Sequence, residues 1–109
     1  MARVSKRVDK VADLLKKEIA LLIQGEVRDP RVGMASVTGV KVSRDLAHAS
    51  VYVTLLGKTS AEEIQEGIDA LNKAAGFLRS LLAKTISLRT TPKLSFIYDD
   101  SLARGQFMT

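Results

Sequence analysis

The chain has 109 residues, of which 46% are hydrophobic and 27% charged, so its composition suits one folded domain with one modest core. It contains no cysteine, which excludes disulfides and thiolate metal sites. A formal net charge of +5 indicates an acidic partner, of which nucleic acid is the commonest and a membrane surface the lesser alternative. No signal peptide is apparent and no run approaches the roughly 18 apolar residues of a membrane span. We therefore expect a cytoplasmic protein without a membrane partner.

A long amphipathic helix is predicted over residues 5–24. Its apolar residues recur at spacings of three and four: Val8, Val11, Leu15, Ile19 and Leu22. Basic residues gather along one flank of that stripe, or just beyond it: Arg3, Lys6, Arg7 and Lys10. They form either a solvated helix surface or part of a contact with a polyanion. Gly25 is expected to end the helix in the left-handed conformation.

Two strand patterns follow a loop at residues 26–34. In the first, Thr38, Val40 and Val42 alternate with Gly39 and Lys41. In the second, residues 49–55 alternate in the same way, and the polar residues 43–46 separate the two. The pattern predicts an antiparallel hairpin with one buried face. The single histidine, His48, is expected on the opposite, exposed face together with Tyr52, as a surface residue and not as a metal ligand.

An acidic helix is predicted next. Ser60 and Glu63 have the spacing of a capping box, and Ile64, Ile68 and Leu71 form an apolar stripe. Residues 60–71 hold four acidic residues and no basic one. Because like charges repel, we expect this helix to point away from any nucleic acid.

The basic stretch 72–93 holds five cations and no acid. An Ala-Ala-Gly step opens it, at Ala74, Ala75 and Gly76. We predict two helices joined by a kink there, although one continuous helix is the alternative. Gly76 would supply conformational freedom and allow a backbone to come close. The apolar face predicted for the second helix comprises Phe77, Leu78, Leu81, Thr85 and Leu88.

A third strand is predicted after Pro92, with Leu94, Phe96 and Tyr98 on one face. We therefore expect one domain over residues 1–100. Residues 101–109 are expected to be the start of a truncated or flexible C-terminal tail. The acidic pair before Ser101 could cap a further helix beginning near Leu102.

Sequence motifs for catalysis, metal binding or cofactor binding are absent. There is no phosphate-binding glycine loop, no HExxH and no paired Cys/His ligands. We accordingly expect a non-enzymatic protein with no cofactor and no metal.

The predicted order is helix, strand, strand, helix, kink, helix, strand. It is the order of the type II KH domain, an α+β fold in which a three-stranded sheet packs against helices and RNA lies on a Gly-x-x-Gly loop. That loop is missing here, and Ala74-Ala75-Gly76 occupies its position. This order of helices and strands predicts a KH-like, RNA-binding domain.

A more specific resemblance covers nearly the whole chain. It rests on the N-terminal basic helix, Arg28-Asp29-Pro30-Arg31, Val40 to Leu46, Ala49 to Val53, the Ala-x-Gly kink, Leu88-Arg89 and Pro92 to Phe96 with Asp99. In these features the chain resembles the ribosome-binding factor A family of bacterial small-subunit assembly factors. The resemblance implies a factor, important in cold growth, that binds the free 30S subunit or its precursor and promotes late maturation and 5′-end processing of 16S rRNA. Family members typically extend further with a mobile tail.

The expected RNA-binding residues are the basic flank of the first helix and the cations near the kink. They are Arg3, Lys6, Arg7, Lys10, Lys73, Arg79, Lys84, Arg89 and Lys93. We expect a monomer that grips the backbone of structured rRNA. Two alternatives remain: a KH-type module that binds short single-stranded RNA, and a basic adaptor for an acidic protein or a membrane.

Overall fold

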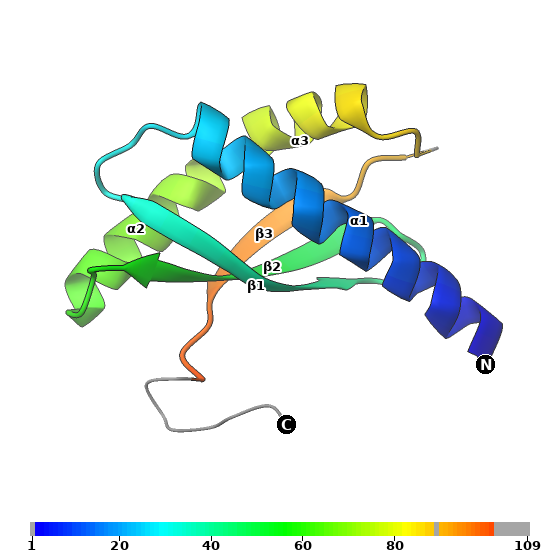
Figure 1. The fold of residues 1–109 in the computed structure, drawn as a ribbon, viewed down its shortest axis with the longest axis horizontal. Coiled ribbons are helices and arrows are strands. Elements are labelled where there is room, and N and C mark those ends of the chain that lie inside the picture. The colour runs from blue at the N-terminus through cyan, green and yellow to red at the C-terminus, as the bar shows by residue number, and fades with distance from the viewer. Residues whose placement is uncertain (1, 89, 102–109) are drawn as a thin grey trace.

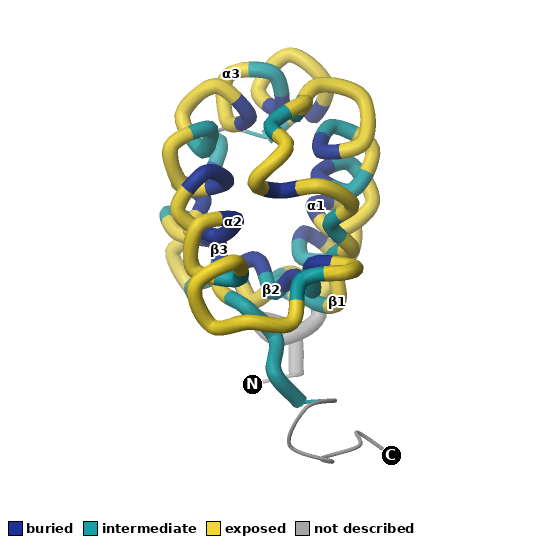
Figure 2. Tube along the Cα trace, turned by 90° about the vertical axis from the view of Figure 1, so that its left-hand side faces the viewer, coloured by how far each residue is buried: buried dark blue, intermediate teal, exposed yellow. Residues whose placement is uncertain are grey.

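Within residues 2–88 and 90–101, which the computed structural model describes with side chains from Arg7 onward, three helices lie on one face of a three-stranded sheet (Figures 1 and 2). The order confirms the predicted α+β, KH-like arrangement. The elements are α1 (Ala2–Glu26), β1 (Met34–Val42), β2 (His48–Leu56), α2 (Ala61–Lys73), α3 (Ala75–Thr85) and β3 (Lys93–Tyr98).

The sheet has the order β1-β2-β3. β1 and β2 form the predicted antiparallel hairpin, whereas β3 pairs with β2 in parallel. A parallel partner has to be reached by a long crossover, and α2 and α3 provide it. The core fills the space between the helices and the sheet, and the buried stretches of the tube in Figure 2 lie on that inner side. It includes Leu15, Ile19, Val51, Leu71 and Leu78, all fully buried.

The end of α1 differs from the prediction. Gly25 lies inside the helix and has no positive φ, so it is not a left-handed cap. The helix continues because Ile23 is only 4% exposed and its carbonyl accepts a hydrogen bond from the Val27 N–H at 3.2 Å. Burial of this last turn outweighs the weak helix propensity of glycine.

The alternation predicted for β1 is broken by a β-bulge. The register shifts between Val37 and Gly39, so Thr38 is exposed and does not share the inner face with Val40 and Val42. Its hydroxyl donates to the Asp99 carboxylate at 2.6 Å. The bulge turns Thr38 toward the segment after β3, a long-range contact that the alternation of β1 alone could not reveal.

The start of α2 agrees with the prediction. The Ser60 hydroxyl accepts from the Glu63 N–H at 3.1 Å, and the Glu63 carboxylate accepts from the Ser60 N–H at 3.4 Å. Ile68 and Leu71 are buried as expected. Gly67 is buried too: a Cβ there would lie 2.8 Å from the backbone oxygen of Arg31. The helix therefore needs glycine to approach the α1–β1 loop.

The predicted kink lies between α2 and α3, at Ala74, but the predicted apolar face of α3 is partly wrong. Leu78 and Leu82 are buried on α3, followed by Ile86. Phe77 is 53% exposed, and Thr85 is also exposed. The corner at Ala74 sets the rotation of α3, so the face that packs on α1 and β3 follows a spacing of four from Leu78. The stretch predicted as a tail lies outside the described residues beyond Ser101.

Candidate nucleic-acid interface

The nine predicted RNA-binding cations are only partly described by the structure. Arg89 and the side chains of Arg3 and Lys6 lie outside the described residues. The other six are all exposed: Arg7, Lys10, Lys73, Arg79, Lys84 and Lys93. Exposure makes each of these charges accessible to a partner.

One end of the sheet brings several of these cations together. The β1–β2 turn (residues 43–47), the start of β3 and the N-terminal half of α1 all lie there (Figure 1). The Lys93 N–H donates to the carbonyl of Ala47 at 2.9 Å, and Arg7 and Arg44 line one hollow. We call this region the turn end. It contains Arg7, Lys10 and Lys93 of the predicted set.

Two further cations of the turn end were not among the predicted site residues. Arg44 lies in the turn itself, and Lys41 is exposed on the open face of the sheet. The exposure of Lys41 could have been predicted from the sequence, because this residue alternates with the inward-facing Val40 and Val42. Arg44 was interpreted only as part of a polar turn, since nothing local indicates that the turn meets α1.

Arg79 has a structural contact that the sequence did not predict. Its Nε and Nη2 donate to the carbonyl of Thr91 at 3.0 and 2.9 Å. Arg79 thus links α3 to the segment that leads into β3. Lys84, on the last turn of α3, makes no such hydrogen bond within the described part of the chain. The charge of Arg79 remains accessible, but its guanidinium is oriented by the chain itself.

Lys73 lies apart from the turn end, near the α1–β1 loop. In that loop, Arg31 forms an ion pair with Asp29 and lowers the pKa of the Asp29 carboxyl to about 2 through side-chain and backbone hydrogen bonds. The charge of Lys73 adds a smaller lowering, which requires it to be close to Asp29. The structure therefore does not unite Lys73 with Arg7 and Lys93.

The acidic face of α2 lies toward the opposite end of the sheet from the β1–β2 turn (Figure 1). Glu62, Glu66 and Asp69 are exposed on it. Asp29, and more weakly Glu66, raise the pKa of Arg31, so this helix faces the α1–β1 loop. The acidic face of α2 and the cations of the turn end thus lie at opposite ends of the sheet, although Arg31 and Lys73 are cations at the α2 end.

The corner between α2 and α3 is made by Ala74, not by Gly76. Ala74 has φ −84° and ψ −4°, and its N–H donates to the carbonyls of Ala70 and Leu71, both at 3.1 Å. Gly76 lies in the first turn of α3 without a positive φ, and a Cβ there would meet nothing within 4 Å. The predicted role of Gly76 in backbone freedom is therefore wrong, and within the described chain no backbone uses the space beside it.

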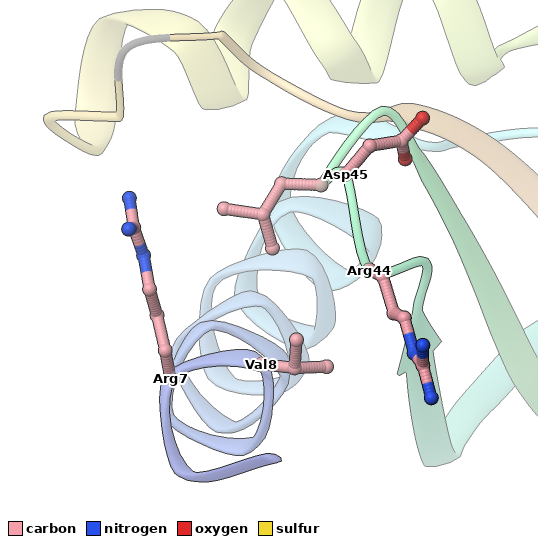
Figure 3. Close-up of a pocket in the computed structure, with 5 residues that line it drawn as sticks. Arg7, Val8, Arg44 and Asp45 are labelled. Carbon is pink, nitrogen blue, oxygen red and sulfur yellow. The ribbon is translucent and has the colours of Figure 1, made fainter. Parts of the chain in front are cut away.

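A hollow of about 310 Å³ separates α1 from the β1–β2 turn. It is lined by Arg7, Val8, Arg44, Asp45 and Leu46. Figure 3 shows the guanidinium groups of Arg7 and Arg44 on opposite sides of Val8. The hollow thus combines two cations with an apolar floor.

The carboxylate of Asp45 belongs to the turn. It accepts from the Ser43 hydroxyl at 2.6 Å and from the Ala47 N–H at 3.0 Å, and these two bonds lower its pKa. In the part of the chain that the structure describes, Asp45 forms an ion pair with neither arginine of the hollow. Asp45 is thus an anion held by its own turn at the edge of the hollow, and it pairs with neither guanidinium.

A metal site and a membrane-spanning helix are both absent from the described residues. Among them, no group of three or more His, Cys, Asp or Glu side chains could hold a metal ion. His48 is exposed on the open face of the sheet. In the same part of the chain, no helix has both the length and the apolar character needed to cross a bilayer.

Comparisons with known proteins agree with this picture. A family model described as ribosome-binding factor A matches residues 7–109. A ribosome-binding factor A of Chromohalobacter salexigens is 54% identical over 104 residues, which are 95% of this chain and 79% of that relative.

Two structural relatives come from Thermus thermophilus. The crystal structure of its ribosome-binding factor A is similar with a TM-score of 0.74 and 28% identity, covering 84% of this chain and 93% of that chain. A homology model of the Thermus thermophilus protein, fitted into a cryo-EM map of a 30S–RbfA complex, is similar with a TM-score of 0.67 and 29% identity. The similarity covers 82% of this chain and 91% of that chain.

Proposed function

Because this chain belongs to the ribosome-binding factor A family, we propose that it is a non-enzymatic assembly factor that binds the free small (30S) ribosomal subunit or its precursor. The observation that carries the proposal is that Arg7, Arg44 and Lys93 lie together at the turn end, at the opposite end of the sheet from the acidic face of α2. The Thermus thermophilus relative that was fitted into a 30S complex supports the choice of partner.

The binding mechanism is contact with RNA phosphates at the turn end and along α3. The contributing cations described by the structure are Arg7, Lys10, Lys41, Arg44, Arg79, Lys84 and Lys93. Such contacts supply affinity and fix the position of the protein on the RNA, but they discriminate little between RNA sequences. Specificity then comes from the shape of one site on the subunit.

Few aromatic side chains are available to stack on bases. Phe96 is buried, and Tyr52 and Tyr98 are half-buried, which leaves Phe77 as the most exposed ring in the described residues. Single-strand readers use several exposed rings in succession. This favours structured RNA over short unstructured RNA as the ligand.

The corner at Ala74-Ala75-Gly76 stands where a KH domain carries its Gly-x-x-Gly loop. The open space beside Gly76 allows an RNA backbone to approach α3 closely. We include this corner in the proposed interface, as a place of backbone contact that reads no base.

We further propose that binding promotes late maturation of the subunit, including 5′-end processing of 16S rRNA, and that it matters most in cold growth. These finer roles follow from the family resemblance. We also propose that the protein acts in the cytoplasm as a monomer and without a cofactor.

The alternative function is a KH-type module for short single-stranded RNA, which the order of the elements favours. The two are separated by measuring binding of the full chain to free 30S subunits and to short unstructured RNAs over a range of salt concentrations. We expect tight, salt-dependent binding to subunits and weak binding to the short RNAs. Tight, sequence-selective binding to the short RNAs would overturn the assembly-factor proposal.

A further inference from the structure

The hollow between α1 and the β1–β2 turn has the features of a subsite and not of a flat charged surface. Its volume of about 310 Å³ is at the lower end of the roughly 300–1,000 Å³ of small-ligand pockets. It can take one nucleoside, and it is too small for a run of bases.

Its two cations flank the hollow. In Figure 3 the guanidinium of Arg7 and that of Arg44 lie on opposite sides of Val8, and the Asp45 carboxylate points away from both. An arginine fork suits a phosphate, so each side of the hollow offers a place for one phosphate of an RNA strand.

The floor of the hollow is apolar and has an unusual backbone. Leu46 has φ +60°, a left-handed conformation that glycine and asparagine adopt far more readily than leucine. Its N–H donates to the Ser43 carbonyl at 2.9 Å, and its side chain is half-buried beside the core. Glycine would adopt this turn with less strain. The presence of leucine therefore indicates that its apolar side chain is needed at this position.

We propose that this hollow holds one unpaired nucleotide of the bound RNA, with its base or ribose on Val8 and Leu46 and its flanking phosphates at Arg7 and Arg44. The inference rests on the proposed RNA-binding function and assigns it a specific subsite. A base within a duplex is stacked and paired and cannot enter, so the nucleotide must be unpaired. The floor has no aromatic ring and would contact the base through apolar groups, so the subsite reads no particular base.

A direct test uses uridine 3′,5′-bisphosphate, which is one nucleotide with both its phosphates. The full chain, methyl-labelled at Val and Leu, is titrated by NMR with the bisphosphate, with inorganic phosphate and with uridine. We expect saturable shifts of the Val8 and Leu46 methyls with the bisphosphate only. The adenosine analogue should bind equally well.

Variants connect these shifts with the proposed contacts. The double variant Arg7→Gln/Arg44→Gln should weaken bisphosphate binding about tenfold or more, because two charge-assisted contacts are lost. The matched control is Arg28→Gln, an exposed arginine of the α1–β1 loop, which should change nothing. Equal shifts with inorganic phosphate, or binding that survives the double variant, would overturn the subsite.

A second measurement tests the requirement for an unpaired nucleotide. A hairpin RNA with one bulged nucleotide should bind more tightly than a fully paired hairpin of equal length. Leu46→Asn should abolish the difference, because asparagine tolerates the left-handed turn but removes the apolar floor; a thermal melt checks that the variant is folded. Equal binding of the two hairpins would refute the inference. Failure of the unmodified chain to bind 30S subunits would instead refute the proposed function.

Discussion

Asn72, on the last turn of α2, exchanges two hydrogen bonds with the backbone of Phe96 in β3. Its amide nitrogen donates to the Phe96 carbonyl at 3.1 Å, and its Oδ1 accepts from the Phe96 N–H at 2.8 Å. β3 is an edge strand, so these backbone groups have no strand partner. The side chain of Asn72 takes the place of the missing strand at this point and protects the edge from pairing with another chain.

Replacing Asn72 by alanine should therefore destabilise the fold. We expect a loss of about 1–3 kcal/mol in the free energy of unfolding, because a part-buried N–H and C=O lose their partners. Urea denaturation measures the loss, and hydrogen exchange at the Phe96 amide should become faster. Gln65→Ala, which removes an exposed bond to Asp69 on the same helix, should stay within about 0.5 kcal/mol. Equal effects of the two substitutions would contradict this role.

Two glycines that look alike in the sequence should respond oppositely to alanine. Gly67→Ala places a Cβ 2.5 Å from Leu55 Cδ1 and 2.8 Å from the Arg31 carbonyl oxygen, and we expect a destabilisation of about 1–3 kcal/mol. Gly76→Ala meets nothing within 4 Å and should stabilise α3 by up to about 1 kcal/mol. Chemical denaturation of both variants measures these changes in the free energy of unfolding. A Gly67→Ala variant as stable as the parent would show that α2 does not pack this closely on the loop.

The stability of the α1–β1 loop should depend on acid pH through Asp29. Its pKa in the folded chain is lowered from the ordinary 3.8 to about 2, chiefly by Arg31. A lowered carboxyl pKa stabilises the fold fully above the unfolded value, and that contribution is lost as the pH falls from about 4 to about 2. The stability difference between the parent and Asp29→Asn should shrink over this range in urea denaturation.

NMR titration of the Asp29 carboxyl tests the same cause directly. The Arg31→Gln variant should return the pKa toward its ordinary value. A midpoint near the ordinary value in the parent chain would contradict the ion pair.

Charge reversal on α3 should weaken binding to 30S subunits. Lys84→Glu should lower the affinity and reduce the slope of log affinity against log salt by about one, as expected for one lost phosphate contact. Glu62→Lys and Glu66→Lys, on the acidic face of α2, should leave the slope unchanged. If they changed it as much as Lys84→Glu, the proposed orientation on RNA would be wrong.

Arg79 needs a separate variant because it also has a structural contact. Arg79→Gln should lower both the subunit affinity and the stability, the latter by about 0.5–1.5 kcal/mol, since the Thr91 carbonyl loses its donor. Lys84→Gln should lower the affinity alone. Thermal melts of both variants, run beside the binding assays, separate the two effects.

The sequence by itself determined the elements, their order and most of the core. The apolar spacing of Leu15 and Ile19, the capping box at Ser60 and the break at Ala74 are all set by residues within a few positions of one another. Such local preferences can be read without knowing how distant parts of the chain meet. The resemblance in sequence also indicated the family.

Only the tertiary structure decided which cations lie together. Arg7 and Arg44 line one hollow because α1 crosses the sheet beside the β1–β2 turn, whereas Lys73 lies near Asp29 despite its place in the basic stretch. At the bulge, the Thr38 hydroxyl donates to the carboxylate of Asp99, 61 residues further along the chain. These relationships follow from strand register and helix rotation, which the packing of the whole core determines and which no local pattern encodes.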